Sequence, residues 1–341
     1  MKAYLIGGLI SLASFSTTLF ANESDYWTER LSISSAIEVE TSYTDSTEWG
    51  NGNSASNIVL ATAKLGLEFK VVENVSINLV TLYKEGAVDF GIHEGFLLLD
   101  KIAGNDLSIS LGKMYLPFGQ FEKTLVADTL ALELVSPDQS VGFRETAAMF
   151  TTSIGAIAVD GYTFNGDVDG KDEIGDWGVS FGYANDNFSF GVDYLNNVAD
   201  SAMITEALWN IEGLTPYHSL SATSVNATIT FATVTLIFEY VQTDSLDVIG
   251  FTSTDAPAIS QIELGYNLGN NWTVAISYQS TDEAFELGMP ESRVSTGFAT
   301  TIYDDAIGVV VEYWHDGDYD VATGGTGEKF NGIVLQIVSE F

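Results

Sequence analysis

The sequence predicts an all-β fold, a transmembrane antiparallel β-barrel of about 16 strands with short periplasmic turns and long extracellular loops. Three observations lead to this prediction. Segments that alternate polar and apolar residues recur along the chain, the connections between them alternate between long and short, and the last segment ends at Phe341.

The alternation is clearest in residues 31–43 and 59–71. In the second segment every odd position is apolar, whereas Lys64, Glu68 and Lys70 stand at even positions. One face of such a strand suits lipid and the other suits water. A soluble β-sandwich has the same period of two, so the pattern alone does not separate the two folds. The predicted strands are residues 31–43, 59–71, 75–84, 91–100, 106–116, 144–152, 154–163, 176–184, 188–195, 219–231, 233–242, 259–267, 272–281, 292–302, 307–316 and 329–341.

The connections favour the barrel. Links after even-numbered strands are short, such as 185–187 and the single residues Ser153 and Ala232, and most are rich in Asn, Asp and Gly, which form tight turns. Links after odd-numbered strands are longer, with residues 85–90 as the one compact exception, and this alternation with an even strand count places both chain ends in the periplasm. Proline cannot donate to a strand ladder, and all five prolines fall in or beside the long links. They are Pro117, Pro137, Pro216, Pro257 and Pro290.

Residues 1–21 have the features of a signal peptide, with Lys2, an apolar run and a cleavage position after Ala21. Residues 22–341 then form a single outer-membrane barrel domain. No later segment approaches the ~18 consecutive apolar residues of a transmembrane helix, so we expect an exported chain that crosses the membrane with strands. The absence of cysteine excludes disulfide, thiolate–metal and cysteine-nucleophile chemistry.

The chain is strongly acidic, with a formal net charge of −35 at pH 7, and we therefore expect no nucleic-acid partner. Solubilised loops or a saline habitat are the favoured explanation of this charge, and an acidic vestibule that concentrates cations is the alternative. No enzyme is expected, because His93, His218 and His315 lack the partners and spacing of a catalytic triad. No cofactor is expected.

Charged residues at inward positions of the predicted strands are candidates for the wall of an aqueous pore, where a barrel sets its selectivity. The alternative is that they pair across strands and only fill the wall. The set contains no ladder of arginines, which disfavours a dedicated phosphate-type anion channel. The pore-lining candidates are Glu38, Glu40, Lys64, Glu68, Lys70, Lys84, Glu94, Lys113, Arg144, Glu239, Glu263, Arg293 and Glu312.

The longest connection, residues 117–143, contains the stretch LVADTLALEL, which is too apolar for a solvent-exposed tether. A loop at this place, after the fifth strand, can fold inward and narrow the pore. The alternative is a loop that packs over the rim or against a neighbouring subunit. The candidates for a constriction loop are Phe121, Glu122, Lys123, Asp128 and Glu133.

Residues 165–176 resemble a calcium-binding loop, with oxygen ligands at the first, third and fifth positions and glycine at the sixth. An aspartate ends the run where glutamate is usual, Asp172 replaces an apolar residue, and no helices flank it. A solvated acidic loop is therefore favoured. The calcium-ligand candidates are Asn165, Asp167, Asp169, Glu173 and Asp176.

Four phrases resemble one family: residues 61–85, HEGFLLLD at 93–100, residues 111–134, and YTFNGDVD at 162–169. They resemble the LbtU-type siderophore porins, with a more distant similarity to phosphate-selective porins, and GKMYLPFGQFE is the most specific part. The resemblance covers most of the first half of the chain. It implies an outer-membrane barrel that imports an iron–siderophore complex without a plug domain. The last strand, ending in Phe341, resembles the signal that the outer-membrane assembly machinery reads.

We therefore expect an outer-membrane porin for passive uptake of small solutes, and the resemblance implies a ferric siderophore imported independently of TonB. One alternative is a general or cation-preferring diffusion porin. Another, of a different class, is a structural or adhesive barrel without transport. The expected partners are outer-membrane lipid and lipopolysaccharide, the assembly machinery and the solute, and a homo-oligomer is compatible with the sequence.

Overall fold

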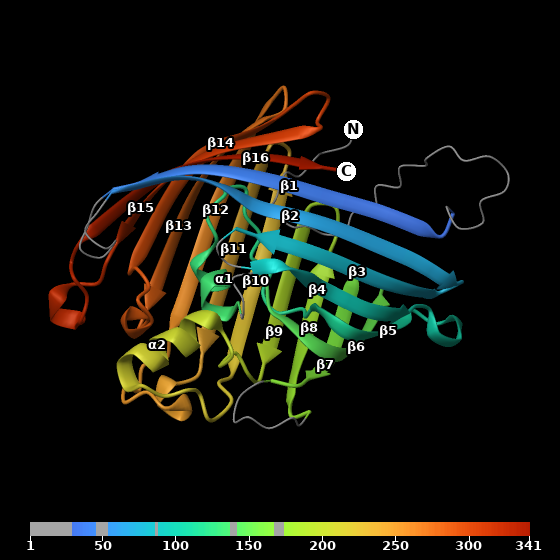
Figure 1. Ribbon diagram of the computed structural model, residues 1–341, viewed down its shortest axis with the longest axis horizontal. Helices are drawn as coiled ribbons and strands as arrows, with labels where there is room; N and C mark the ends of the chain where they lie inside the picture. The colour runs from blue at the N-terminus through green and yellow to red at the C-terminus, as the bar shows by residue number, and fades with distance from the viewer. Residues whose placement is uncertain (1–28, 46–53, 86–87, 137–141, 167–173) are drawn as a thin grey trace.

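The computed structural model describes residues 29–45, 54–85, 88–136, 142–166 and 174–341, and these form a closed antiparallel barrel (Figure 1). Each strand pairs with its neighbours in sequence, and β1 pairs with β16. The predicted sixteen-stranded barrel is confirmed. The strands are β1 (Leu31–Thr44), β2 (Ala55–Val72), β3 (Val75–Lys84), β4 (Val88–Leu99), β5 (Leu107–Tyr115), β6 (Arg144–Ile154), β7 (Ile157–Phe164), β8 (Asp176–Ala184), β9 (Phe188–Leu195), β10 (Ala222–Phe231), β11 (Val234–Thr243), β12 (Ala258–Gly269), β13 (Trp272–Asp282), β14 (Ser292–Ile302), β15 (Ile307–Gly317) and β16 (Lys329–Glu340).

The short connections are turns with left-handed backbone conformations. Asn74, between β2 and β3, has a φ of 61°, and Gly155, between β6 and β7, has a φ of 64°. Asn and Gly tolerate this conformation better than most residues. The prediction that Ser153 alone links two strands is wrong, because β6 continues to Ile154 and the turn forms at Gly155 and Ala156.

Each strand presents apolar side chains to the outside of the barrel. Phe238, Ile262 and Leu264 on β11 and β12 are 40%, 47% and 45% exposed, whereas the intervening Glu239 and Glu263 are buried. Successive side chains of a strand point to opposite faces of the sheet. The outer surface is therefore apolar and the inner surface is polar.

A β-bulge near Ala61 interrupts the alternation predicted for β2, because the register with β1 shifts there. Val59 pairs with Glu40, and Ala63 pairs with Ile37. Glu40 and Ile37 point to opposite faces of β1, so Val59 and Ala63 also point to opposite faces. The prediction that all odd positions of this segment share one face is therefore wrong at Val59.

Both α helices of the described residues occur in connections at the end that carries the long links, here called the long-loop end. The helix α1 (Leu130–Val135) follows Thr129, whose side chain accepts the N–H of Leu132 at 3.1 Å. The helix α2 (Ala202–Glu212) ends at Gly213, which has a φ of 67°. In the part of the chain that the structure describes, no helix combines the length and apolar character that crossing a membrane requires. The 3₁₀ helices within the described residues are η1 (Ile102–Gly104), in the short link between β4 and β5, and η3 (Leu246–Ile249), η4 (Phe285–Leu287) and η5 (Val321–Thr323), in long links.

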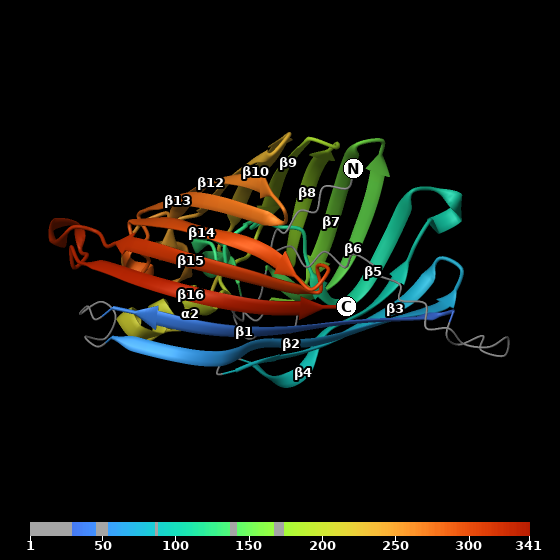
Figure 2. The same cartoon turned by 90° about the horizontal axis from the view of Figure 1, so that it is seen from above.

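An apolar cluster fills part of the long-loop end. It joins side chains of the β5–β6 and β9–β10 connections, including both α helices, to the ends of several strands. Phe118, Leu130, Ile204 and Leu220 belong to it and are at most 1% exposed. Burial of such a side chain stabilises a fold by roughly 1.5–3 kcal/mol. Figures 1 and 2 show α2 at this end of the barrel.

Candidate pore constriction

Residues 116–136 of the β5–β6 connection, here called the inner loop, run inside the barrel. The loop extends from Leu116 to Ser136 and contacts inward-facing residues of β9, β11, β12, β13, β14 and β15. In Figure 1 its helix α1 lies within the ring of strands. The inner loop therefore covers one wall of the lumen.

Three glutamates of that wall hold the extended backbone of the inner loop. Glu239 on β11 accepts the N–H groups of Gln120 and Phe121, each at 2.8 Å. Glu263 on β12 accepts the N–H of Thr124 at 2.7 Å. These glutamates are 2% and 1% exposed, so the carboxyl acceptors are buried together with the backbone groups that they bind. A hydrogen bond to a carboxyl group is stronger when that group is ionised.

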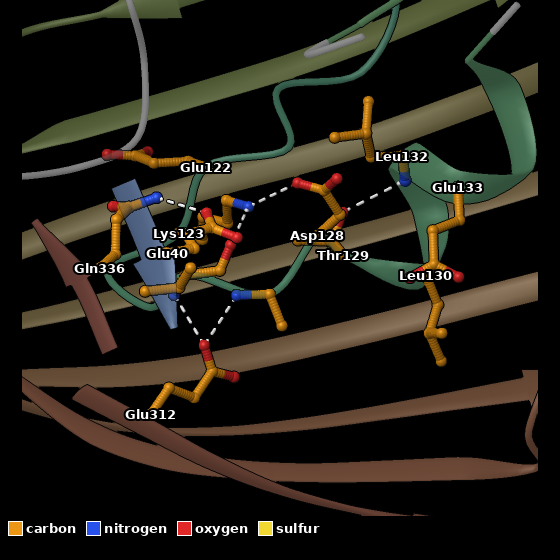
Figure 3. A network of polar contacts seen from close by, with 12 residues as sticks. Glu40, Glu122, Lys123, Asp128, Thr129, Leu130, Leu132, Glu133, Glu312 and Gln336 are labelled. Atoms are coloured by element: carbon orange, nitrogen blue, oxygen red, sulfur yellow. Dashed lines mark hydrogen bonds and ion pairs between the residues drawn. The ribbon is translucent and has the colours of Figure 1, made fainter. Parts of the chain in front are cut away.

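The third glutamate is Glu312 on β15. Its Oε2 accepts the N–H groups of both Val126 and Ala127, each at 2.7 Å (Figure 3). Asp193 on β9 accepts the N–H of Gly119, and the side chain of Gln279 on β13 accepts that of Leu130. An extended loop forms no hydrogen-bond ladder of its own, so its buried N–H groups need acceptors from the wall.

Ion pairs fix the second half of the inner loop. Lys123 Nζ lies 2.7 Å from Asp128 Oδ1 and also donates to the Val126 carbonyl (Figure 3). Arg293 on β14 makes two hydrogen bonds to Asp316, of 2.8 and 3.0 Å, and a third of 3.1 Å to Glu133 in α1. Bidentate pairing of this kind orients the guanidinium group.

Burial and the adjacent Lys123 act in opposite directions on Asp128, which belongs to the loop and not to a strand. Burial by itself raises the pKa of this carboxyl group, but the Lys123 ammonium and its hydrogen bond outweigh burial. The pKa of Asp128 therefore lies below its ordinary value. Asp128 therefore stays ionised near neutral pH.

The side chains of the predicted constriction residues contact the wall and the loop itself. Phe121 is 6% exposed and belongs to the apolar cluster. Glu122 is 7% exposed and accepts the hydroxyl of Thr228 on β10. Lys123 is also buried, whereas Asp128 and Glu133 retain partial exposure. The pore solvent would therefore contact mainly other parts of the inner loop and the wall that β1, β2 and β3 form.

The opposite wall, formed by β1, β2 and β3, retains exposed charge. Its inward-facing charged residues are half-buried or exposed, and Glu40 accepts a hydrogen bond of 2.8 Å from Gln336 on β16 (Figure 3). Both signs of charge are equally represented on this wall. Its members are Glu38, Glu40, Lys64, Glu68, Lys70 and Lys84.

The other pore-lining candidates are less accessible. Glu94 and Arg144 are buried, and Arg144 donates to the carbonyl of His93 at a register shift between β3 and β4. Lys113 is half-buried and pairs with Gly95 in the register of β4 and β5. Glu239, Glu263, Glu312 and Arg293 hold the inner loop, as described above. A pore-lining role remains a prediction for the whole set.

The calcium-site prediction falls mostly outside the described residues, because Asp167, Asp169 and Glu173 lie there. Asp176 accepts hydrogen bonds from Asn196, Asn197 and Ser219. Asn165 has a buried side-chain oxygen without a hydrogen-bond partner. Among the residues that are described, no three acidic or histidine side chains form a group that could hold a metal ion. Calcium binding therefore remains a prediction.

Sequence reasoning did not identify the acceptors of the inner loop as a group. Alternation placed Glu239, Glu263 and Glu312 on the inner face, but it treated all inward charges alike. It also gave no role to Asp193 and Gln279, and it left α2 as part of a long connection. One signal is that five carboxylates stand at inward positions of β9, β11, β12 and β15 without inward lysine or arginine residues on those strands.

The fold and the inner loop define a porin-like β-barrel, and comparisons with solved structures agree. The anion-selective porin from Comamonas acidovorans superposes with a TM-score of 0.67 at 14% sequence identity, covering 91% of this chain and 99% of that one. The outer membrane channel DcaP of Acinetobacter baumannii gives a TM-score of 0.62 at 12% identity, covering 91% of this chain and 97% of that one. At such identities the likeness shows the fold alone.

Curated relatives carry no functional name. The UPF0422 protein lpl2888 of Legionella pneumophila (strain Lens) is 23% identical over 334 residues, covering 89% of this chain. The UPF0422 protein of Coxiella burnetii is 23% identical over 320 residues, covering 87%. This chain spans 62% and 66% of the length of these relatives. No family model matches the chain, and the resemblance to LbtU-type siderophore porins is not confirmed.

Proposed function

We propose that this protein is an outer-membrane channel for passive diffusion of small solutes. The observation that carries the proposal is the inner loop, which is bound to the β9–β15 wall while β1, β2 and β3 keep their inward charges accessible. Sixteen strands enclose more space than wall side chains alone can fill, and an inward loop narrows that space. The apolar outer face suits contact with lipid.

The proposed substrate is a ferric siderophore, taken up without an energised receptor. This part of the proposal is supported by the resemblance of residues 112–122 to LbtU-type siderophore porins. That segment contains the end of β5 and the start of the inner loop. An exposed wall of mixed charge suits a solute that carries both iron-binding anionic groups and polar groups. A general or cation-preferring diffusion porin is the alternative within the same class.

Conductance in planar bilayers tests the channel proposal. Stable single-channel steps from purified protein support a porin. Growth of a deletion strain on low iron then tests the substrate, with single siderophores supplied as the iron source. Loss of growth on a siderophore, restored by the intact gene, supports siderophore uptake. Normal growth on every siderophore favours the general porin.

A structural or adhesive barrel is the second candidate function, and the apolar cluster at the long-loop end favours it. Residues such as Leu130 and Ile204 fill interior space that an open channel would leave to water. If the protein is a structural or adhesive barrel, we expect the folded protein to insert into bilayers without conducting ions. Absence of conductance steps from protein whose insertion is verified by protease protection would contradict the channel proposal and support a structural or adhesive barrel.

A further inference from the structure

A small polar cavity lies between the inner loop and the strands that hold it. Its volume is about 10 Å³, which is close to the minimum for one water molecule or one ion of similar size. The cavity is separate from the exposed wall of β1, β2 and β3. Its polar lining comes from Lys123 and Thr129 of the loop and from Gln261, Glu263, Ser277, Gln279, Ser295 and Glu312 of the wall.

Three oxygen atoms of this lining have no hydrogen-bond partner. They are Gln261 Oε1, Ser277 Oγ and Ser295 Oγ, and the three residues are 2%, 2% and 2% exposed. The amide nitrogen of Gln261 donates to the carbonyl of Glu122 at 3.3 Å, which leaves the amide oxygen free. A buried polar atom without a partner costs free energy, so an occupant that binds these atoms is favoured.

The strand register brings these oxygens together. Glu263, Ser277 and Ser295 are direct register partners on β12, β13 and β14. The two serines are small, so they leave space beneath the loop. The occupant would therefore meet two hydroxyl oxygens, one amide oxygen and the carboxylates of the lining.

The charge of the lining selects the occupant. Glu263 and Glu312 are the acidic residues of the cavity lining, and Lys123 is its basic residue. The Lys123 ammonium also binds Asp128 Oδ1 and the Val126 carbonyl. Asp128 therefore compensates the Lys123 ammonium, which leaves the carboxyl groups of Glu263 and Glu312 without a counter-charge of their own in the lining. Buried carboxylates without a counter-charge are unfavourable.

We propose that this cavity binds one monovalent metal cation, with sodium as the ion of suitable charge and size. One such ion supplies positive charge beside Glu263 and Glu312, and hard cations prefer oxygen ligands. Calcium is disfavoured, because it takes six to eight oxygen ligands, whereas a cavity of about 10 Å³ offers three unpaired oxygens besides the carboxyl groups. The ion joins the inner loop to β12, β13 and β14, and it does not depend on solute transport.

Thermal unfolding of the purified barrel in detergent tests the proposal. The melting temperature is measured in sodium chloride and in choline chloride of equal concentration. We expect a melting temperature lower by about 2–4 °C in choline, the size of shift that the loss of a modest binding energy produces. The double variant Ser277→Ala/Ser295→Ala should remove this difference.

Ser110→Ala is the matched control, because Ser110 is buried on β5 outside the cavity lining. It should retain the difference between the two salts. Equal melting temperatures of the unmodified protein in both salts would overturn the proposal. A difference that persists in the double serine variant would overturn it too.

Crystals soaked in thallium(I) acetate provide a second, independent measurement. Thallium replaces a monovalent cation and scatters anomalously, so we expect an anomalous peak between Ser277, Ser295 and Glu263. An ordered water molecule at this position, with no anomalous signal, would show that the unpaired oxygens bind water and would refute the cation site.

Discussion

Glu239 binds the backbone N–H of Phe121 at 2.8 Å although 118 residues separate the two in sequence. The other oxygen of the same carboxylate binds the N–H of Gln120. Phe121 has a φ of 47°, an uncommon conformation for an aromatic residue. Two hydrogen bonds to one carboxylate therefore hold the inner loop where its backbone is least relaxed.

Removal of the glutamate acceptors should loosen the inner loop. Glu239→Ala and Glu312→Ala each delete a carboxylate that binds two N–H groups, and hydrogen bonds to charged groups contribute about 1.5–3 kcal/mol. We expect amide hydrogen exchange of residues 119–127 to accelerate by about tenfold or more in each variant. Mass spectrometry of exchanged peptides measures this change.

Two further variants sharpen that measurement. Glu312→Gln keeps an acceptor oxygen, so exchange should accelerate less than in Glu312→Ala. Glu68→Ala, on the exposed wall, should leave loop exchange unchanged. Wild-type exchange rates in Glu312→Ala would mean that the carboxylate does not hold the loop in the membrane-embedded protein.

Deletion of residues 124–133 should widen the pore and change its selectivity. The deletion removes the N–H groups that bind Glu263 and Glu312, so both carboxylates become accessible to ions. We expect higher single-channel conductance, entry of larger solutes and a stronger preference for cations. Unchanged conductance, in a variant whose electrophoretic mobility shows a folded barrel, would place the constriction in the wall charges.

Orientation can be tested with single cysteines, because the chain has none of its own. Asp186 is exposed in the turn between β8 and β9, and Asn210 is exposed on α2. An impermeant maleimide on intact cells should label Asn210→Cys and not Asp186→Cys. The reverse pattern would invert the predicted topology.

Ion selectivity should be weak in the intact protein. Three acidic and three basic candidates remain accessible on β1, β2 and β3, whereas Glu239, Glu263 and Glu312 are covered. These wall charges balance, but the chain as a whole has a formal net charge of −35, so we expect a slight cation preference in reversal potentials. The preference should be smaller at high ionic strength because salt screens the charges.

Opposite single substitutions provide the control for this prediction. Glu40→Gln should shift the reversal potential toward anions, and Lys64→Gln should shift it toward cations. Strong anion selectivity of the unmodified protein would instead show that the basic residues of β2–β6 dominate the narrowest point.

Most of the fold could be predicted because its signals are local. Alternation with a period of two and turn residues such as Asn74 identify strands and turns without long-range information. The bulge at Ala61 was not predicted, because an extra residue in one strand can be recognised only from the register with the paired strand.

The candidate site was only partly predictable. The alternation of polar and apolar residues places both Glu40 and Glu239 on the inner face of the barrel. In the structure Glu40 is accessible, whereas the inner loop covers Glu239. The difference depends on the path of the inner loop across strands that follow it in the chain. The apolar character of residues 125–134 indicated a packed loop, but nothing in the sequence specified which wall it packs against.

The contacts of the inner loop also impose an order on assembly. The loop is synthesised before every strand that holds it, and Ala127 precedes its hydrogen-bond partner Glu312 by 185 positions in the sequence. Such distant contacts form only after the intervening chain is in place. The ring of strands must therefore be largely paired while the loop is still unattached and its acceptors are hydrated. Attachment of the inner loop is then a late step of assembly. Before this step, the pore of a newly closed barrel is wider than the pore of the mature protein.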